Sequence, residues 1–249
     1  MSAKEPTPAI WPAVLLLAGV MALFEVTNLD LALEDRFFDF ATQRWWVDAG
    51  DPLWRALCYT GPKSVILGLG VALLALALGP AAWRTRLQVA RRDVAVAVLT
   101  LASVPALVGL GKTATNVFCP SELRRYGGDV RYVKLGERFP PDDHPARRGR
   151  GFPAGHASGG FALIGLLGVR RTQAWRRGVQ LLALGAGWWM GGYQMLRGAH
   201  FLSHTVVTML LAWIITLAWR RVIAAEGDPE LTTVPAASRP AGESVLTRA

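Results

Sequence analysis

Long apolar stretches separated by short polar segments dominate the chain. Six of them come close to the roughly 20 apolar residues that a helix needs to cross the hydrocarbon core of a bilayer. The pattern therefore predicts an all-α polytopic membrane protein, a bundle of six transmembrane helices. A single basic residue before the first stretch favours a retained span over a signal peptide. The stretches are Ile10–Val26, Lys63–Ala82, Val94–Gly111, Ala154–Val169, Gly178–Leu196 and Phe201–Trp219.

The composition agrees with a membrane protein. Of the 249 residues, 52% are hydrophobic and only 18% are charged, which is unusual for a soluble domain. We expect one membrane domain over residues 1–225, with outward loops at about 27–62 and 112–152. Residues 226–249 are rich in Pro, Ala, Thr and Ser, which predicts a disordered cytoplasmic tail.

The net charge of +9 would suggest a nucleic-acid partner if it were spread over the chain. Most of it lies instead in three clusters, which alternating spans place on one side of the membrane. Short basic loops mark the cytoplasmic face, so we expect a bacterial inner-membrane protein with both termini cytoplasmic and no nucleic-acid partner. The clusters are Arg84, Arg86, Arg91 and Arg92, then Arg170, Arg171, Arg176 and Arg177, then Arg220 and Arg221.

Both outward loops have a distinctive composition. The aromatic residues at 37–46 of the first loop predict a helix lying in the membrane interface, with an aromatic-anchored connection as the alternative. The second loop is basic, which suggests an anionic partner such as phosphate, and a solvated charged loop is the alternative. Its basic residues are Arg124, Arg125, Arg131, Lys134, Arg138, Arg147, Arg148 and Arg150.

The histidines and cysteines all fall on the predicted outer side. Ionisable groups at membrane depth are candidates for function. The compartment outside an inner membrane is oxidising, which permits a disulfide between Cys58 and Cys119; two unpaired cysteines are the alternative. The histidines are His144 in the second loop, His156 at the start of the fourth stretch, and His200 and His204 at the start of the sixth.

The segment "GFPAGHASGGFAL", residues 151–163, predicts a helix start that can bind phosphate. Pro153 suits a first helical turn, so the N–H groups of Ala154, Gly155 and His156 should point outward with the helix dipole behind them. Gly155 lets a ligand approach the backbone, and His156 could protonate a leaving oxygen.

The octapeptide "RGAHFLSH", Arg197 to His204, carries a second set of candidates. On one helix, Arg197, His200 and His204 would share a face. A neutral His200 could attack phosphorus and carry a phosphoryl group, while Arg197 clamps the phosphate oxygens and His204 orients the nucleophile. Lys112, at the end of the third stretch, would add a fixed positive charge.

Together these residues resemble the three signatures of the type-2 phosphatidic acid phosphatase superfamily, which comprises lipid phosphatases, phosphotransferases and the related vanadium haloperoxidases. The resemblance runs from about the second span to the sixth. It implies that His200 is the phosphoryl-accepting nucleophile and His156 the acid, that Lys112 and the Gly155 backbone bind phosphate, and that no metal or other cofactor is needed. The matching residues are Lys112 with Cys119-Pro120, then Pro153-Ala154-Gly155-His156, then His200.

The chain departs from these signatures at four positions. They read Lys, six residues, Arg-Pro; then Pro-Ser-Gly-His; then Ser-Arg, five residues, His, three residues, Asp. Cys119 stands at the place of the first arginine and Ala154 at that of the serine. Gln194 stands at the place of the second arginine and His204 at that of the aspartate.

Other arginines could restore the lost positive charge. Arg197 follows Gln194 by three residues, almost one helical turn, and could reach the same pocket. Arg124 or Arg125 could likewise replace the arginine lost at Cys119. We therefore expect a divergent branch with a rearranged phosphate clamp.

The functional hypothesis is an integral-membrane lipid phosphate phosphatase. It would hydrolyse a phosphomonoester or pyrophosphate through a phosphohistidine at the outer leaflet, facing the periplasm. Lipid A phosphate, an isoprenyl pyrophosphate, phosphatidic acid and phosphatidylglycerol phosphate all fit, and the oligomeric state stays open. Alternatives are a lipid phosphotransferase, a non-catalytic lipid-binding descendant, and a zinc enzyme using His200, His204 and either His156 or Asp142.

Overall fold

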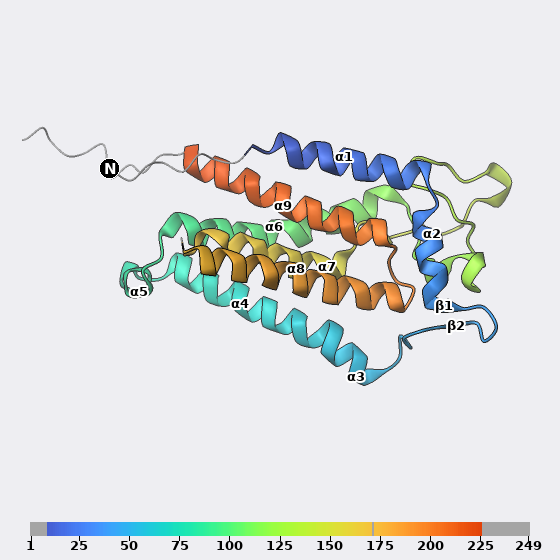
Figure 1. The fold of residues 1–249 in the computed structure, drawn as a ribbon, viewed down its shortest axis with the longest axis horizontal. Coiled ribbons are helices and arrows are strands. Elements are labelled where there is room, and N and C mark those ends of the chain that lie inside the picture. The colour runs from blue at the N-terminus through green and yellow to red at the C-terminus, as the bar shows by residue number, and fades with distance from the viewer. Residues whose placement is uncertain (1–8, 171, 226–249) are drawn as a thin grey trace, which may run out of the picture.

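The computed structural model describes residues 9–170 and 172–225, and it is mostly helical. Its longest helices run side by side as a bundle (Figure 1). Each predicted apolar stretch overlaps one helical region, so the helical class is confirmed. The predicted tail at 226–249 lies outside the described residues. The regions are α1 (Trp11–Val26), α4 (Gly61–Leu78), α6 (Arg91–Thr115), α7 (Gly155–Ala162) with the 3-10 segment η6 (Leu163–Gly168), α8 (Gln173–Leu196) and α9 (Leu202–Ala225).

Short elements form the connections. α5 joins α4 to α6, and the other short elements lie in the two long connections, 27–60 and 116–154. They are α2 (Leu29–Glu34), η1 (Asp35–Phe37), β1 (Phe38–Asp39), β2 (Arg44–Trp45), α3 (Pro52–Arg55), the π-helical turn η2 (Ala56–Thr60), α5 (Ala81–Leu87), η3 (Pro120–Glu122), η4 (Arg124–Tyr126) and η5 (Pro141–Asp143).

Fewer helices than predicted are long and apolar enough to be candidate membrane spans. Three helical regions within the described residues are long and apolar enough to cross a membrane: 52–78, 91–122 and 202–223. A fourth span results if α1 and the segment 29–37, which are bent by 77° relative to each other, count as one. The regions at α7 and α8 do not qualify, because α7 is short and the glutamine, tryptophan and glycine residues of α8 lower its mean hydropathy. The six-span count is therefore not confirmed.

The predicted interfacial helix at residues 37–46 is wrong. Strands β1 and β2 pair antiparallel there, with Phe38 opposite Trp45. The Asp39 carboxylate accepts hydrogen bonds from the N–H groups of Ala41 and Thr42 at 2.9 and 3.3 Å, which closes the turn. The rings of Phe38 and Trp45 pack 4.9 Å apart and both contact Tyr126. The aromatic side chains thus anchor a hairpin against the second loop.

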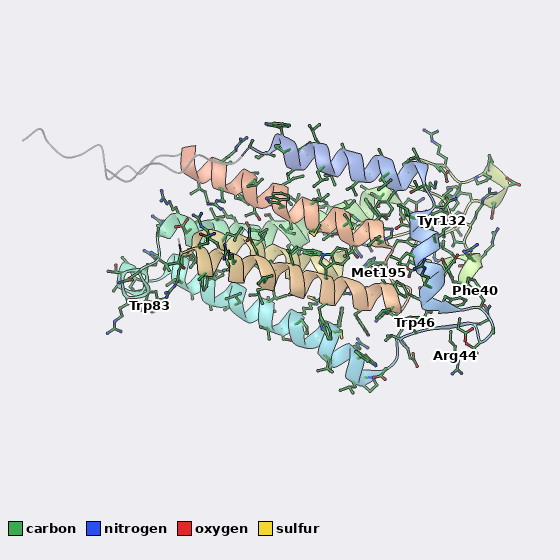
Figure 2. The ribbon with its side chains drawn as sticks, viewed as in Figure 1. Phe40, Arg44, Trp46, Trp83, Tyr132 and Met195 are labelled. Atoms are coloured by element: carbon green, nitrogen blue, oxygen red, sulfur yellow. The ribbon has the colours of Figure 1, made fainter. Side chains whose placement is uncertain are left out.

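The two ends of the bundle differ in charge and in structure. α5, the starts of α6 and α8, and the end of α9 lie at one end, and the two long connections lie at the other (Figure 1). The basic clusters that the structure describes therefore share one end, as the alternation of spans predicted. Trp83 lies at that end and Trp46 at the opposite one (Figure 2), where amphipathic rings of a membrane protein gather.

Helix α7 lies at the centre of the bundle. It packs against α6, α8 and α9, and its small buried residues Ala157 and Ala162 allow these helices to approach closely. By contrast, α4 exposes Val65, Leu67 and Val71 on its outer face. This arrangement places the first turn of α7 among neighbours and leaves an apolar flank suited to lipid chains.

Candidate active site

Three histidines meet at the end of the bundle that carries the long connections. His156 lies in the first turn of α7, His200 just before α9, and His204 in the first turn of α9. The His200 ring is 5.7 Å from the rings of both His156 and His204, measured between centroids. His200 and His204 are each only 2% exposed. The structure therefore brings together three of the residues that the sequence singled out.

The octapeptide at 197–204 does not lie on one helix, and the prediction of a shared helical face is wrong. α8 ends at Leu196, and Gly198 adopts a positive φ of 71°. The Gly198 and Ala199 N–H groups donate to the Met195 and Gln194 carbonyls at 2.9 and 2.7 Å. This pattern is a Schellman helix ending, and it favours glycine at the left-handed residue.

The turn that results presents the His200 ring to the site. The His200 N–H donates to the Gln194 carbonyl at 3.3 Å, so Gln194 positions the histidine through the backbone. Both ring nitrogens of His200 are buried and lack a hydrogen-bond partner among the described residues. The Gly151 backbone lies near the ring, but not in hydrogen-bonding geometry. A buried imidazole without partners is costly, which favours a ligand at this place.

His204 contacts His200 without a hydrogen bond. The two rings meet edge to face at an angle of 63°, and the Nδ1 atom of His204 has no partner in the described chain. The ring is held by Phe152 and Phe201, whose centroids lie 5.2 and 5.4 Å away. In this state His204 therefore packs beside the nucleophile candidate and does not orient it through a hydrogen bond.

Lys112 reaches the site from the last turn of α6. Its side chain lies against the backbone of Gly155, since a Cβ atom on Gly155 would come within 2.9 Å of the Lys112 Cε and 3.2 Å of its Nζ. A larger residue at this position would force the end of the lysine side chain to shift. The ammonium group is held beside the first turn of α7.

The start of α7 differs slightly from the prediction. The helix begins at Gly155 rather than Pro153, and the Ala154 N–H donates to the His204 carbonyl at 3.2 Å, so it is not free. The N–H groups of Gly155 and His156 belong to the first helical turn, which has no carbonyl one turn earlier to accept them. Two backbone donors, rather than three, remain for an anion.

Arg197 supplies a second positive charge. Its guanidinium lies over the Tyr193 ring, with Cζ 5.6 Å from the ring centroid, and its buried Nε has no hydrogen-bond partner in the described chain. Its charge acts on both His156 and Cys119. Among residues 9–170 and 172–225, no ion pair involves Arg197 or Lys112. The two cations are available to an anionic ligand.

A sequence model of the PAP2 superfamily matches residues 93–228, more than half of the chain. The chain belongs to the PAP2 superfamily. No curated protein and no solved structure matches it significantly. Membership of the PAP2 superfamily supports a phosphatase-type activity. The match covers α6 to α9, and so includes Lys112, His156 and His200, whereas α1 to α5 lie outside it.

Arg124 and Arg125, the candidates to replace the arginine that the PAP2 signature has at the place of Cys119, are both held in ion pairs. The Arg124 guanidinium forms a bidentate pair with Asp143, and that of Arg125 pairs with Asp35, its Nε 2.7 Å from the carboxylate. These surface pairs leave neither group free for a ligand. His144, an exposed residue, also lies apart, with its Nδ1 3.0 Å from the Pro145 carbonyl oxygen.

Both cysteines are free, so the structure shows the unpaired alternative rather than a disulfide. Cys58 is buried beside Val47 and Tyr193. Cys119 caps the short turn η3, and its N–H donates to the Glu122 carboxylate at 2.8 Å. The position that carries a phosphate-binding arginine in the PAP2 signature therefore carries a thiol that shapes the adjacent loop.

The zinc hypothesis gains no support from the geometry. No group of three or more His, Cys, Asp or Glu side chains within residues 9–170 and 172–225 is arranged to hold a metal ion. Asp142, a possible third ligand, lies in η5 beside His144 and Arg131 around a surface hollow of about 440 Å³. That hollow is part of the outer loop and excludes the three clustered histidines.

Sequence reasoning missed a carboxylate and an aromatic residue at the site. The Asp30 carboxylate, from α2, accepts the Ser203 N–H at 2.9 Å and so caps α9. The Tyr59 ring, from η2, lies 4.7 Å from that of His156. Both residues precede the matched region, and neither belongs to a recognisable motif, so only their spatial neighbours reveal them.

Proposed function

We propose that this protein is an integral-membrane phosphatase of lipid phosphates that acts through a phosphohistidine intermediate. One observation carries the proposal: a buried histidine, His200, has two unpartnered ring nitrogens and faces a second histidine, His156. The unpaired cations Lys112 and Arg197 flank this pair. A phosphate dianion would satisfy these groups together.

In the first step, a ring nitrogen of His200 attacks phosphorus. The bond between phosphorus and the leaving oxygen breaks, and His156, in its protonated form, gives that oxygen a proton. Lys112, Arg197 and the free N–H groups of Gly155 and His156 stabilise the charge that spreads over the phosphoryl oxygens. Because these donors are held in place before reaction, the site needs little reorganisation.

In the second step, water replaces the histidine. His156, now neutral, accepts a proton from the water molecule as its oxygen attacks phosphorus, and the bond to His200 breaks. The products are inorganic phosphate, the free imidazole of His200 and a protonated His156. Two easier displacements thus replace one difficult hydrolysis, and the chain supplies all the groups that these steps require.

Membrane placement supports a lipid substrate. Apolar helices long enough to cross a bilayer flank a site that lies at one end of the bundle. A lipid head group could therefore enter the site while its chains stay in the hydrocarbon region. The basic clusters lie at the opposite end, which by the positive-inside tendency favours a site facing the periplasm of a bacterial inner membrane.

The test is phosphate release from a panel of lipid phosphates by the full-length protein in detergent, with EDTA present. We expect release by the wild type, no release above background by His200→Ala, and normal release by the matched control His144→Ala. Release that survives in His200→Ala would refute the phosphohistidine mechanism. Loss of release in EDTA, with recovery on adding zinc, would instead establish a metal-dependent enzyme.

A further inference from the structure

A second group of cations lies beside His156, outside the region that matches the PAP2 superfamily. The Tyr59 ring is 4.7 Å from the His156 ring, between centroids. The Nζ atom of Lys63 lies 5.8 Å from the Tyr59 centroid, and Cζ of Arg55 lies 6.0 Å from it. These three residues come from α3, η2 and α4, which follow one another in the continuous helical region 52–78.

Neither cation of this group is neutralised by an acidic side chain. No ion pair in the part of the chain that the structure describes involves Arg55 or Lys63. Both side chains are exposed, and Lys63 acts electrostatically on His156 together with Lys112 and Arg197. Three cations therefore act on one imidazole, and Arg55 adds a fourth beside the neighbouring Tyr59 ring, which is more positive charge than a single phosphate dianion requires.

We propose that Arg55 and Lys63 bind a second phosphate group, carried by the leaving group of the substrate. This inference rests on the proposed function and narrows its substrates to lipids with two phosphates close together. The first phosphate would lie between His200 and His156, and the second beside Tyr59.

The reaction chemistry explains why a second phosphate would bind beside Tyr59. His156 is the group that protonates the leaving oxygen, so residues beside it are placed to contact the leaving group. When that group is itself a phosphate, it departs with negative charge that nearby cations stabilise. The Tyr59 hydroxyl can donate a further hydrogen bond to it.

A structural explanation of the same residues makes a different prediction. A lysine at the start of a span commonly extends to the membrane surface, and cations commonly stack on tyrosine rings. If that is all that Arg55 and Lys63 do, replacing them changes the turnover of every substrate to the same small extent. The ratio of kcat/KM for a two-phosphate lipid to kcat/KM for a one-phosphate lipid therefore distinguishes the two explanations.

Two kinds of lipid carry the required pair of phosphates. In an isoprenyl diphosphate the two groups are joined directly, whereas phosphatidylglycerol phosphate has a phosphodiester one glycerol unit away. Phosphatidic acid, with one phosphate, is the reference. We would measure kcat/KM for all three with the wild type, Lys63→Gln, Arg55→Gln and the control Arg86→Gln, which lies at the far end of the bundle in α5.

We expect Lys63→Gln and Arg55→Gln each to lower kcat/KM for a two-phosphate lipid about tenfold relative to phosphatidic acid, as loss of a charge-assisted hydrogen bond would. Lys63→Arg, which keeps the charge, should largely restore the ratio, and Arg86→Gln should not change it. The substrate whose ratio falls identifies the source of the second phosphate. Ratios unchanged in both glutamine variants would overturn the proposal.

Binding separates a failure of this inference from a failure of the proposed function. With full-length His200→Ala, calorimetry with inorganic diphosphate and inorganic phosphate needs no turnover. We expect tighter binding of diphosphate, and loss of that preference when Lys63→Gln and Arg55→Gln are added. A preference that survives these substitutions refutes the second subsite. If the wild type shows no hydrolase activity and the preference still depends on these residues, the proposed hydrolysis is refuted but the subsite is not.

Discussion

The cations of the candidate site and those of the outer loop are of the same residue types but have opposite surroundings. Lys112 and Arg197 are half-buried and have no carboxylate partner within the described residues. In the loop at 112–152, each of three arginines is paired with an aspartate: Arg124 with Asp143, Arg125 with Asp35 and Arg147 with Asp129. These three loop arginines are thus basic in sequence but already paired in space.

The difference shows which positive charges can bind a ligand. A half-buried cation without a counter-ion raises the free energy of the folded protein, so its retention favours a role in binding an anion. Paired surface arginines contribute little stability each, and their carboxylates occupy the donors that a phosphate would need. The surface pairs therefore do not favour the sequence hypothesis that Arg124 and Arg125 bind phosphate, whereas the unpaired state of Arg197 favours it for that residue.

The largest expected effect tests this contrast directly. Arg197→Gln should lower kcat for lipid phosphate hydrolysis by about 100-fold or more, in line with loss of one transition-state donor. Arg124→Gln should leave kcat within a factor of about two, because its charge is already neutralised in a surface pair. Phosphate release at saturating substrate measures both.

Two outcomes would break the contrast. Equal losses in Arg197→Gln and Arg124→Gln would show that the loop arginine reaches the substrate after all. If kcat were unchanged in Arg197→Gln, the reaction would use Lys112 but not Arg197. Thermal unfolding of both variants in the same detergent checks that each is folded.

A smaller effect is expected at Asp30, which supports the site by stabilising the start of α9. Asp30 is 7% exposed and accepts the Ser203 N–H at the start of α9. Asp30→Ala removes this helix cap, so we expect a loss of about 1–2 kcal/mol in the free energy of unfolding. The positions of His200 and His204 should loosen with the helix, which lowers kcat more than it raises KM. Denaturant or thermal unfolding and steady-state kinetics measure the two effects.

The control for Asp30 is Asp30→Asn, which keeps an oxygen acceptor for the cap. It should retain most of the stability and activity that Asp30→Ala loses. If Asp30→Asn were as damaging as Asp30→Ala, the negative charge rather than the cap would be the important property. An unchanged unfolding midpoint in Asp30→Ala would show that α9 does not need this contact.

The smallest expected effect is the pH dependence of stability that arises from the arginine–aspartate pairs of the outer loop. The hydrogen bonds from Arg147 hold the pKa of Asp129 below its usual value, and those from Arg124 do the same for the pKa of Asp143. A carboxyl with a lowered pKa in the folded state stabilises that state above its unfolded pKa, about 4. This stabilisation is lost as the pH falls through the lower folded value.

We therefore expect Asp129→Asn to unfold at a slightly lower temperature than the wild type at pH 7. The difference in unfolding temperature between the two proteins should persist down to about pH 5. It should then disappear as the wild-type carboxylate becomes protonated below about pH 4. Unfolding midpoints of both proteins across this pH range provide the measurement. A gap that stayed constant into strong acid would show that the Arg147 pair contributes nothing to stability.

Much of the fold and part of the site could be predicted because the relevant signals are local. Long apolar stretches locate the six helical regions, and the spacing of the family motifs singles out Lys112, His156 and His200. The break at Gly198 was also predictable, since glycine after a helix favours a Schellman ending, but the apparent i, i+3, i+7 pattern concealed it. The hairpin at Phe38 and Trp45 was missed because its aromatic residues pack against Tyr126, more than 80 positions away in the chain.

The sequence by itself determined the helical class, the order of the helices and the spacing of the residues that place the chain in the PAP2 superfamily, because each depends on neighbours within a few turns. Only the tertiary structure decided which cations are paired and which are free. The Arg125–Asp35 pair joins residues 90 positions apart, and Tyr59 meets His156 across a similar distance in sequence. Such contacts depend on how the helices and loops pack in three dimensions, which no local pattern of residues encodes.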